Sequence, residues 1–212
     1  MYIPESFKET DPEIIRAFIR AHPFGILVNS VGDLPQATHL PFELVHQGGE
    51  AYALQTHLAR ANPHWKSLDP TREVLVIFSG PHGYISARWY DHLNVPTMNY
   101  LAVHAYGKPR LVEDPAEVYA ILKRQVDARE GEGNPAYSVE GLPERFLQNE
   151  MRALVGLEVE ISRMQASFKL SQNRDEANYR NILDELGNRH EAGDPALREE
   201  MRKVYERKEY KK

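Results

Sequence analysis

The sequence contains no cysteine in 212 residues. Without a thiol the chain forms no disulfide, binds no metal through thiolates and has no cysteine nucleophile, and this absence suits a reducing compartment. Long apolar runs are missing too, since no stretch approaches the ~20 residues that span a bilayer. The first residues, Met1 to Glu5, have neither the basic nor the apolar segment of a signal peptide. We therefore expect a cytoplasmic protein with no membrane partner.

An excess of positive charge is also absent. Lys and Arg number 26 against 31 Asp and Glu, which gives a net charge of −5 and a pI near 6.0. Such a surface does not favour nucleic-acid binding over the whole molecule. Basic residues gather only between Arg198 and Lys212, where a solvated helix is the simpler explanation. DNA is therefore a candidate partner with only weak support from charge.

The sequence has no recognisable metal or nucleophile motif. None of its nine histidines forms a His-x-x-x-His or Glu-x-x-His pair on a predicted helix, where that spacing would place two ligands on one face. His39, His57 and His104 could converge from neighbouring strands, but no spacing supports it. A Gly-x-Ser-x-Gly nucleophile elbow is missing as well. We predict no metal site and assign no catalytic residue.

What the chain does contain is a series of short strands followed by helices. Apolar and polar residues alternate between Val155 and Ser162, as in a half-exposed strand. Similar reasoning predicts strands at 24–29, 36–45 with an interruption at Pro41, 51–56, 73–78 and 97–106. Helices are predicted from a Thr10–Glu13 capping box to Pro23 and at 115–128, 143–151, 173–186 and 195–208. The fold class expected is mainly β with peripheral helices (α+β), a closed or split β-barrel. Strands and helices do not alternate, which disfavours a doubly wound sheet.

The segment Trp89–Gly107 is dense in aromatic, histidine and asparagine side chains. Its second half predicts a strand, and Pro96 holds the preceding residue extended. Flat rings and hydrogen-bonding groups at the start of a core strand suit the wall of a site for a planar ligand. An aromatic hairpin corner explains the same residues, and the sequence leaves both interpretations open.

A second segment, Phe168–Arg174, suggests an anion site. It carries two cations, a hydroxyl and amides just ahead of a predicted helix, where free backbone N–H groups favour a phosphate. An elaborate helix cap, with Asn173 and Glu176 as its pair, explains it equally well. Arg60 and Asn62 form another plausible anion contact. Together these features suit a phosphorylated planar ring, such as a flavin or a pyridoxal nucleotide.

Seven motifs in order resemble one known family. They are Met1–Pro4, Thr38–Pro41, His57–Trp65, Gly80–Ser86, Trp89–Tyr90, Val95–Tyr100 and Lys169–Arg174. The chain resembles PaiB-type proteins, the negative transcriptional regulators of protease synthesis and sporulation. They are a branch of the FMN-binding split-barrel group, which includes pyridoxamine-phosphate oxidases and flavin reductases. The resemblance implies a six-stranded split barrel and a homodimer that holds FMN at the subunit interface.

The same resemblance implies which residues contact the cofactor. Flavin and phosphate contacts would come from Thr38, His39, His57, Ala59, Arg60 and Asn62; the ring side of the pocket from Trp89, Tyr90, Thr97, Asn99 and Tyr100; and the closing segment from Lys169, Ser171 and Gln172. The resemblance ends near Leu186. We therefore expect an FMN-binding domain at 1–187, with inserted helices at 114–153, and a helical tail at 188–212.

Three functions remain open from the sequence. The first is an FMN-binding homodimeric regulator. The second is an FMN-dependent oxidoreductase, in which Arg60 or Lys169 would stabilise the reduced anionic flavin. The third is an accessory protein of an acetyltransferase or polyamine pathway that binds a partner and no flavin.

Overall fold

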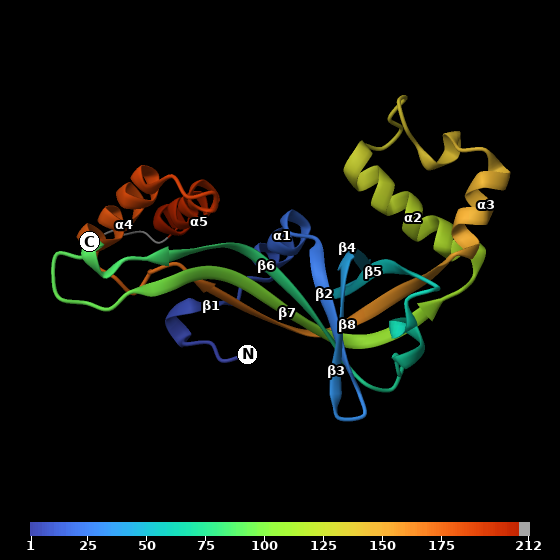
Figure 1. The fold of residues 1–212 in the computed structure, drawn as a ribbon, viewed down its shortest axis with the longest axis horizontal. Coiled ribbons are helices and arrows are strands. Elements are labelled where there is room, and N and C mark those ends of the chain that lie inside the picture. The colour runs from blue at the N-terminus through green and yellow to red at the C-terminus, as the bar shows by residue number, and fades with distance from the viewer. Residues whose placement is uncertain (208–212) are drawn as a thin grey trace. The chain divides into compact units, whose positions relative to one another are not determined.

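The computed structural model of the chain describes residues 1–207. Within them are eight strands, five α-helices and four short 3-10 helices (Figure 1). The strands are β1 (Lys8–Glu9), β2 (Phe24–Val31), β3 (Leu34–Pro41), β4 (Glu43–Gly48), β5 (Ala51–Ala59), β6 (Val74–Ile85), β7 (Thr97–Val112) and β8 (Leu154–Lys169). The helices are α1 (Pro12–Ala21), α2 (Pro115–Glu130), α3 (Glu144–Arg152), α4 (Glu176–Arg189) and α5 (Asp194–Arg207), with 3-10 helices η1 (Glu5–Phe7), η2 (Pro63–Ser67), η3 (Ala87–Trp89) and η4 (Val139–Gly141).

The strands form one sheet in the order β3-β2-β6-β7-β8-β5-β4, and β1 pairs with β8. The pairings of β2 with β3 and β6, and of β5 with β4 and β8, are antiparallel. β3 and β4 stand at the two ends of this order, so the sheet is not closed by a pairing between them. A mainly antiparallel sheet with peripheral helices is the fold class that the sequence predicts.

The helix starts show how far local sequence decides structure. Asp114 accepts hydrogen bonds from the backbone N–H groups of Ala116 (2.9 Å) and Glu117 (3.1 Å), as the Asp-Pro start of α2 predicts. The Thr10 capping box expected for α1 is wrong. Asp11 caps this helix instead and accepts from the N–H of Glu13 at 2.8 Å, because the helix begins one residue later, at Pro12.

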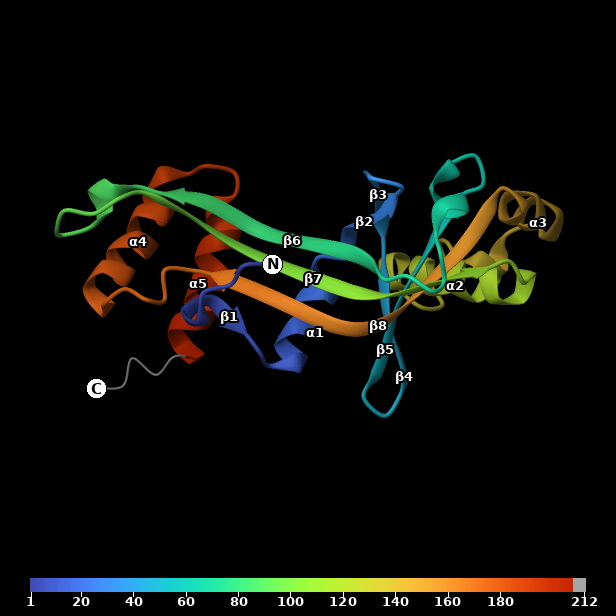
Figure 2. The ribbon, with the colours of Figure 1, turned by 90° about the horizontal axis from the view of Figure 1, so that it is seen from below.

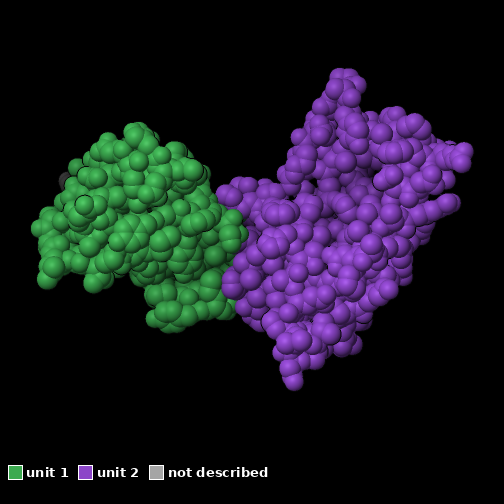
Figure 3. Space-filling view, in the orientation of Figure 1, with its two compact units in different colours: residues 1–18, 79–103, 165–212 green, residues 19–78, 104–164 purple. Residues whose placement is uncertain are grey.

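The chain divides into two compact units, coloured separately in Figure 3. Unit 1 comprises residues 1–18, 79–103 and 165–212, and unit 2 comprises residues 19–78 and 104–164. The three long strands β6, β7 and β8 each contribute residues to both units. Each unit has its own buried core.

The core of unit 2 lies beneath β5 and the inserted helices. Phe42 and Phe78 are fully buried and meet edge to face, with ring centroids 5.7 Å apart. α2 packs on β5, and its buried Val118 and Ile121 form a cluster with Val112 of β7. Gly107 allows a close approach of β7 to β8, since a Cβ there would stand 2.0 Å from the backbone oxygen of Glu160.

The core of unit 1 includes the C-terminal helices. α4 and α5 pack on each other, as Figures 1 and 2 show, and Tyr179 of α4 donates a hydrogen bond to the backbone oxygen of Met201 at 2.8 Å. Leu197, Met201 and Val204 of α5 are buried. The basic C-terminal segment is therefore packed along one face up to Arg207, and its remaining residues, 208–212, lie outside the described residues. None of the helices within 1–207 is both long and apolar enough to cross a bilayer.

Candidate functional site

The residues predicted to contact a cofactor fall into two groups, one in each unit. Unit 2 contains Thr38, His39, His57, Ala59, Arg60 and Asn62, and unit 1 contains Trp89, Tyr90, Thr97, Asn99, Tyr100, Lys169, Ser171 and Gln172. Within each group the structure brings several of these side chains into contact. Some bond to one another, while others are engaged by residues that the sequence analysis did not assign to the site.

In unit 2 a polar network forms around His64, whose side chain is fully buried. Its Nδ1 lies 2.6 Å from the hydroxyl of Thr38, and its Nε2 lies 2.9 Å from Oδ1 of Asn29. Asn62 caps η2 by accepting a hydrogen bond from the backbone N–H of His64 at 3.0 Å, and its amide nitrogen lies 3.4 Å from the Thr38 hydroxyl. Strand β3 and the loop after β5 are thus joined through one histidine.

The hydrogen-bond directions in this network follow from Asn29. Its amide nitrogen donates to the backbone oxygen of Ser67 at 3.0 Å, so its Oδ1 is left to accept from Nε2–H of His64. Nδ1 of a neutral His64 then carries no proton and accepts from the Thr38 hydroxyl. Burial lowers the pKa of His64, which keeps the imidazole neutral. The Thr38 oxygen, with its proton used, can only accept a hydrogen bond from a ligand.

His39 and His57 lie in different surroundings from each other. His39 is exposed and stacks on Phe24, with centroids 5.9 Å apart and an interplanar angle of 29°. His57 is half-buried, and its Nδ1 lies 2.7 Å from Oε1 of Gln125 on α2. Burial lowers the pKa of His57, and the Gln125 hydrogen bond opposes that shift. No group of three His, Asp or Glu side chains among the described residues could hold a metal ion.

Arg60 follows the exposed Ala59 at the end of β5. Its Nη1 donates to Glu113 at 3.1 Å, and its guanidinium carbon stands 5.9 Å from the ring centroid of Trp65. Trp65 in turn donates from Nε1 to the backbone oxygen of Arg60 at 3.1 Å. Arg60 keeps 38% of its side chain exposed, which leaves its other N–H groups accessible.

In unit 1 the aromatic pair Trp89 and Tyr90 is flanked by cations. Arg189 lies 5.1 Å from the Trp89 ring centroid, and Arg174 lies 4.9 Å from that of Tyr90. The Tyr90 side chain is buried, and its hydroxyl has no hydrogen-bond partner among residues 1–207. A buried, unpaired hydroxyl costs free energy, so it marks a place where a ligand or another chain could supply a partner.

The start of β7 is joined to the end of β8 by side chains. Lys169 donates to the hydroxyl of Thr97. Asn99, fully buried, accepts from the hydroxyl of Ser171 at 3.0 Å, and its amide nitrogen lies 3.5 Å from the sulfur of Met201. Tyr100 is half-buried, and its hydroxyl lies 3.4 Å from that of Ser167. Ser171 is 3% exposed and has φ of 61°, a left-handed conformation that is rare outside glycine.

Gln172 and the start of α4 act as a cap. The Gln172 amide bonds to both backbone ends of its own loop, accepting from Leu170 N–H at 2.7 Å and donating to the oxygen of Phe168. The helix is capped by Asp175, which accepts from Asn178 N–H at 2.9 Å, and not by Asn173. A carboxylate already occupies this helix terminus, and these hydrogen bonds lower its pKa. The helix end therefore adds nothing to an anion site.

Several residues in these networks were not predicted from the sequence. His64, Asn29, Gln125 and Glu113 are the partners that orient Thr38, His57 and Arg60. The sequence does contain a signal for His64. Asn62-Pro63 is a typical helix start, and His64 is the residue whose backbone N–H the Asn62 cap would accept. Asn29 and Gln125 had no such signal, since they meet their histidines only in the folded sheet.

Solved structures share this fold. The flavocytochrome Anf3 from Azotobacter vinelandii superposes with a TM-score of 0.59, covering 82% of this chain and 75% of that chain at 18% identity. The FAD and heme binding protein from Mycobacterium smegmatis also gives 0.59, covering 76% and 73% at 15% identity. Likeness at this identity establishes the fold alone. It confirms the expected split-barrel architecture of flavin-binding type.

Sequence similarity then identifies the family. Residues 1–163 match the family model described as "Putative FMN-binding domain". The chain is also 38% identical over 190 residues to "Protease synthase and sporulation protein PAI 2" of Bacillus subtilis (strain 168), covering 89% of this chain and 90% of that relative. The chain therefore belongs to this FMN-binding-domain family, and the resemblance to PaiB-type proteins is confirmed.

Proposed function

We propose that the protein binds FMN as a homodimer and acts as a regulator of the PaiB type. The observation that carries the proposal is the family match, which extends over residues 1–163 of 212. The extended similarity to the Bacillus subtilis sporulation protein supports the regulatory part. Regulation would be cytoplasmic and would respond to the redox state or occupancy of the flavin.

The residues present fit the chemistry of FMN. The isoalloxazine ring carries an N–H donor, and the Thr38 hydroxyl oxygen can only accept. The phosphate requires cations, and Arg60 and Lys169 supply a half-exposed guanidinium and a partly buried ammonium. The unpaired Tyr90 hydroxyl adds a group that a ligand or partner could satisfy. Hydroxyl, amide and cationic groups of this kind are the contacts that a phosphorylated ring needs.

The predicted cofactor contacts in both units remain a proposal, as does the division into a cofactor domain at 1–187 and a helical tail. A dimer is supported by exposed apolar side chains in the loop before β7 and at the start of that strand. Leu93 is fully exposed, and Val95 and Met98 are 69% and 43% exposed. Light scattering on the purified protein tests this part, and a monomer at all concentrations would contradict it.

The alternative is an FMN-dependent oxidoreductase. FMN would supply hydride or electron transfer when bound, and a cation such as Arg60 would favour the reduced anionic ring. Steady consumption of NADH or NADPH by the FMN-loaded protein would support this function. A regulator without turnover would instead bind DNA with an affinity that falls steeply as salt rises.

FMN binding is tested first. The purified protein should show flavin absorbance or quench FMN fluorescence during titration. Replacing both Arg60 and Lys169 by Ala should weaken FMN binding by about a hundredfold, because two charge-assisted contacts are lost. Riboflavin, which lacks the phosphate, should lose far less affinity.

Arg20→Ala serves as the control for removal of a surface cation, since Arg20 is exposed on α1 and belongs to no predicted contact. It should leave FMN binding unchanged. Equal losses for FMN and riboflavin in the double variant would refute the phosphate assignment. No binding of FMN to the unmodified protein would refute the whole proposal.

A further inference from the structure

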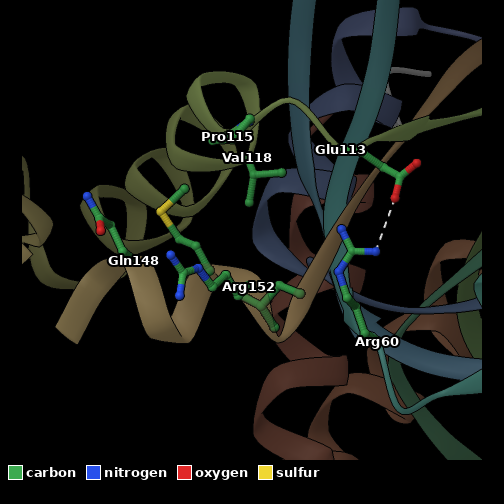
Figure 4. Close-up of a pocket in the computed structure, with 8 residues that line it drawn as sticks. Arg60, Glu113, Pro115, Val118, Gln148 and Arg152 are labelled. Atoms are coloured by element: carbon green, nitrogen blue, oxygen red, sulfur yellow. Dashed lines mark hydrogen bonds and ion pairs between the residues drawn. The ribbon is translucent and has the colours of Figure 1, made fainter. Parts of the chain in front are cut away.

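A pocket of about 410 Å³ lies within unit 2, beside the inserted helices. Its lining includes Arg60, Glu113, Val118, Gln148, Met151 and Arg152. Figure 4 shows Arg60 and Glu113 facing each other, while Val118 comes from α2 and Gln148 and Arg152 come from α3. The volume falls in the range of small-molecule sites, about 300–1,000 Å³. No predicted cofactor contact other than Arg60 lines it.

The floor of this pocket is apolar and packed against a buried cluster. Val118 is 4% exposed and belongs to the buried cluster with Val112 and Ile121, against which Met151 also packs. The start of α2, which carries Val118, is held by the Asp114 cap. A preformed apolar surface of this kind binds the hydrocarbon part of a ligand without an ordering cost.

The rim carries an excess of positive charge. Arg60 donates to Glu113 at 3.1 Å, so this cation and this carboxylate compensate each other. Arg152 is exposed at the end of α3 and has no ion pair or hydrogen bond from its side chain to any described residue. One uncompensated guanidinium thus stands over an apolar floor. A guanidinium binds a carboxylate through two parallel hydrogen bonds.

We propose that this pocket binds a small monocarboxylate with an apolar body. The net rim charge matches one negative charge better than the two of a phosphate, and the floor formed by Val118 and Met151 matches a short hydrocarbon chain. Arg152 binds the carboxylate and Arg60 lies beside it. This site goes beyond the flavin proposal: it shares Arg60 with it, but its carboxylate ligand Arg152 and its floor residue Met151 belong to no predicted FMN contact.

The experiment uses the full chain and hexanoate as the probe, with chemical shifts of the labelled protein as the readout. Hexanoate should shift the resonances of α2 and α3, and the shifts should reach a plateau at a hexanoate concentration of about 10 mM. Arg152→Gln should weaken hexanoate about tenfold, because one charge-assisted contact is lost. Arg145→Gln is the matched control, since Arg145 is an exposed arginine of the same helix outside the pocket. It should change nothing.

Two further ligands test the chemistry. 1-Hexanol has the same chain without the charge and should bind more weakly, and inorganic phosphate should not compete. Absence of saturable hexanoate binding, or equal losses in Arg152→Gln and Arg145→Gln, would overturn the proposal. FMN titrations of the same variants separate the two sites: Arg152→Gln should leave FMN affinity unchanged. An equal loss for FMN and hexanoate would mean that the pocket belongs to the flavin site, which also overturns the proposal.

Discussion

Two hydroxyl–amide groups, one in each unit, use the same chemistry in opposite ways. In unit 2 the Thr38 hydroxyl and the Asn62 amide are half-buried and converge on His64. In unit 1 the Ser171 hydroxyl and the Asn99 amide are 3% and 0% exposed and bond to each other. Residue type is nearly the same in the two groups, and burial is what separates them.

The difference teaches which predicted contacts can meet a ligand directly. The Thr38 hydroxyl donates to His64 and its oxygen accepts from the Asn62 amide at 3.4 Å, which leaves one lone pair for a ligand N–H. Ser171 and Asn99 form their hydrogen bond with each other, which joins β7 to the turn after β8. We therefore expect substitution of Thr38 to affect binding and substitution of Asn99 to affect folding.

The largest effect is expected from Asn99→Ala. The change removes the acceptor of a buried hydroxyl and leaves a small cavity beside Met201, so the free energy of unfolding should fall by about 2–3 kcal/mol. Urea denaturation followed by circular dichroism measures it. Asn173→Ala, at an exposed position three residues before α4 begins, is the control and should be neutral. Equal stability of the two variants would remove the distinction drawn between the two groups.

Thr38→Val should destabilise the protein less than Asn99→Ala does, but it should weaken FMN binding. Valine keeps the shape but leaves Nδ1 of His64 without its donor, which should lower the free energy of unfolding by about 1 kcal/mol. Loss of the acceptor should weaken FMN binding about tenfold, measured by fluorescence titration. Thr38→Ser, which retains the hydroxyl, should bind like the unmodified protein. If both variants bind FMN normally, Thr38 does not contact the flavin.

A dependence of stability on pH should come from the histidines of unit 2. Burial lowers the pKa of His64, so as the pH falls the unfolded chain binds a proton at a higher pH than the folded protein does. This contribution is complete above the ordinary histidine pKa of about 6.5 and is lost as the pH falls below it. The urea midpoint should therefore fall between about pH 7 and pH 5, and less so in His64→Gln. A His64 variant whose urea midpoint depends on pH as in the unmodified protein would contradict the assignment.

The smallest effect on stability is expected from Arg60→Gln. The ion pair with Glu113 is exposed on both sides, at 38% and 59%, so its loss should cost no more than about 0.5 kcal/mol. FMN affinity should nevertheless fall if Arg60 binds the phosphate. Urea unfolding and FMN titration of the same preparation separate the effect on stability from the effect on FMN affinity. A large loss of stability would show that Arg60 acts as a structural residue, like Asn99.

Much of the fold could be predicted from local sequence. The Asp114-Pro115 start of α2 and the strand at 155–162 needed only a cap and a period of two. The strand runs on to Lys169, and its predicted half-exposed face is wrong at Gly156 and Glu158, which are buried in the folded sheet. The Thr10 cap was wrong because the cap position depends on where Pro12 falls in the first turn. Of the site, the motifs predicted its residue types but not which of them are buried.

The sequence by itself determined the family, the strand-rich architecture and the absence of thiol chemistry, because these depend on residue identity and short spacing. Only the tertiary structure decided the partners. His64 meets Asn29 across 35 positions of the chain, His57 meets Gln125 across 68, and Ser171 meets Asn99 across 72. Hydrogen-bond direction, burial and pKa shifts arise from such contacts, and a linear pattern carries no signal for groups that meet only when the sheet has formed.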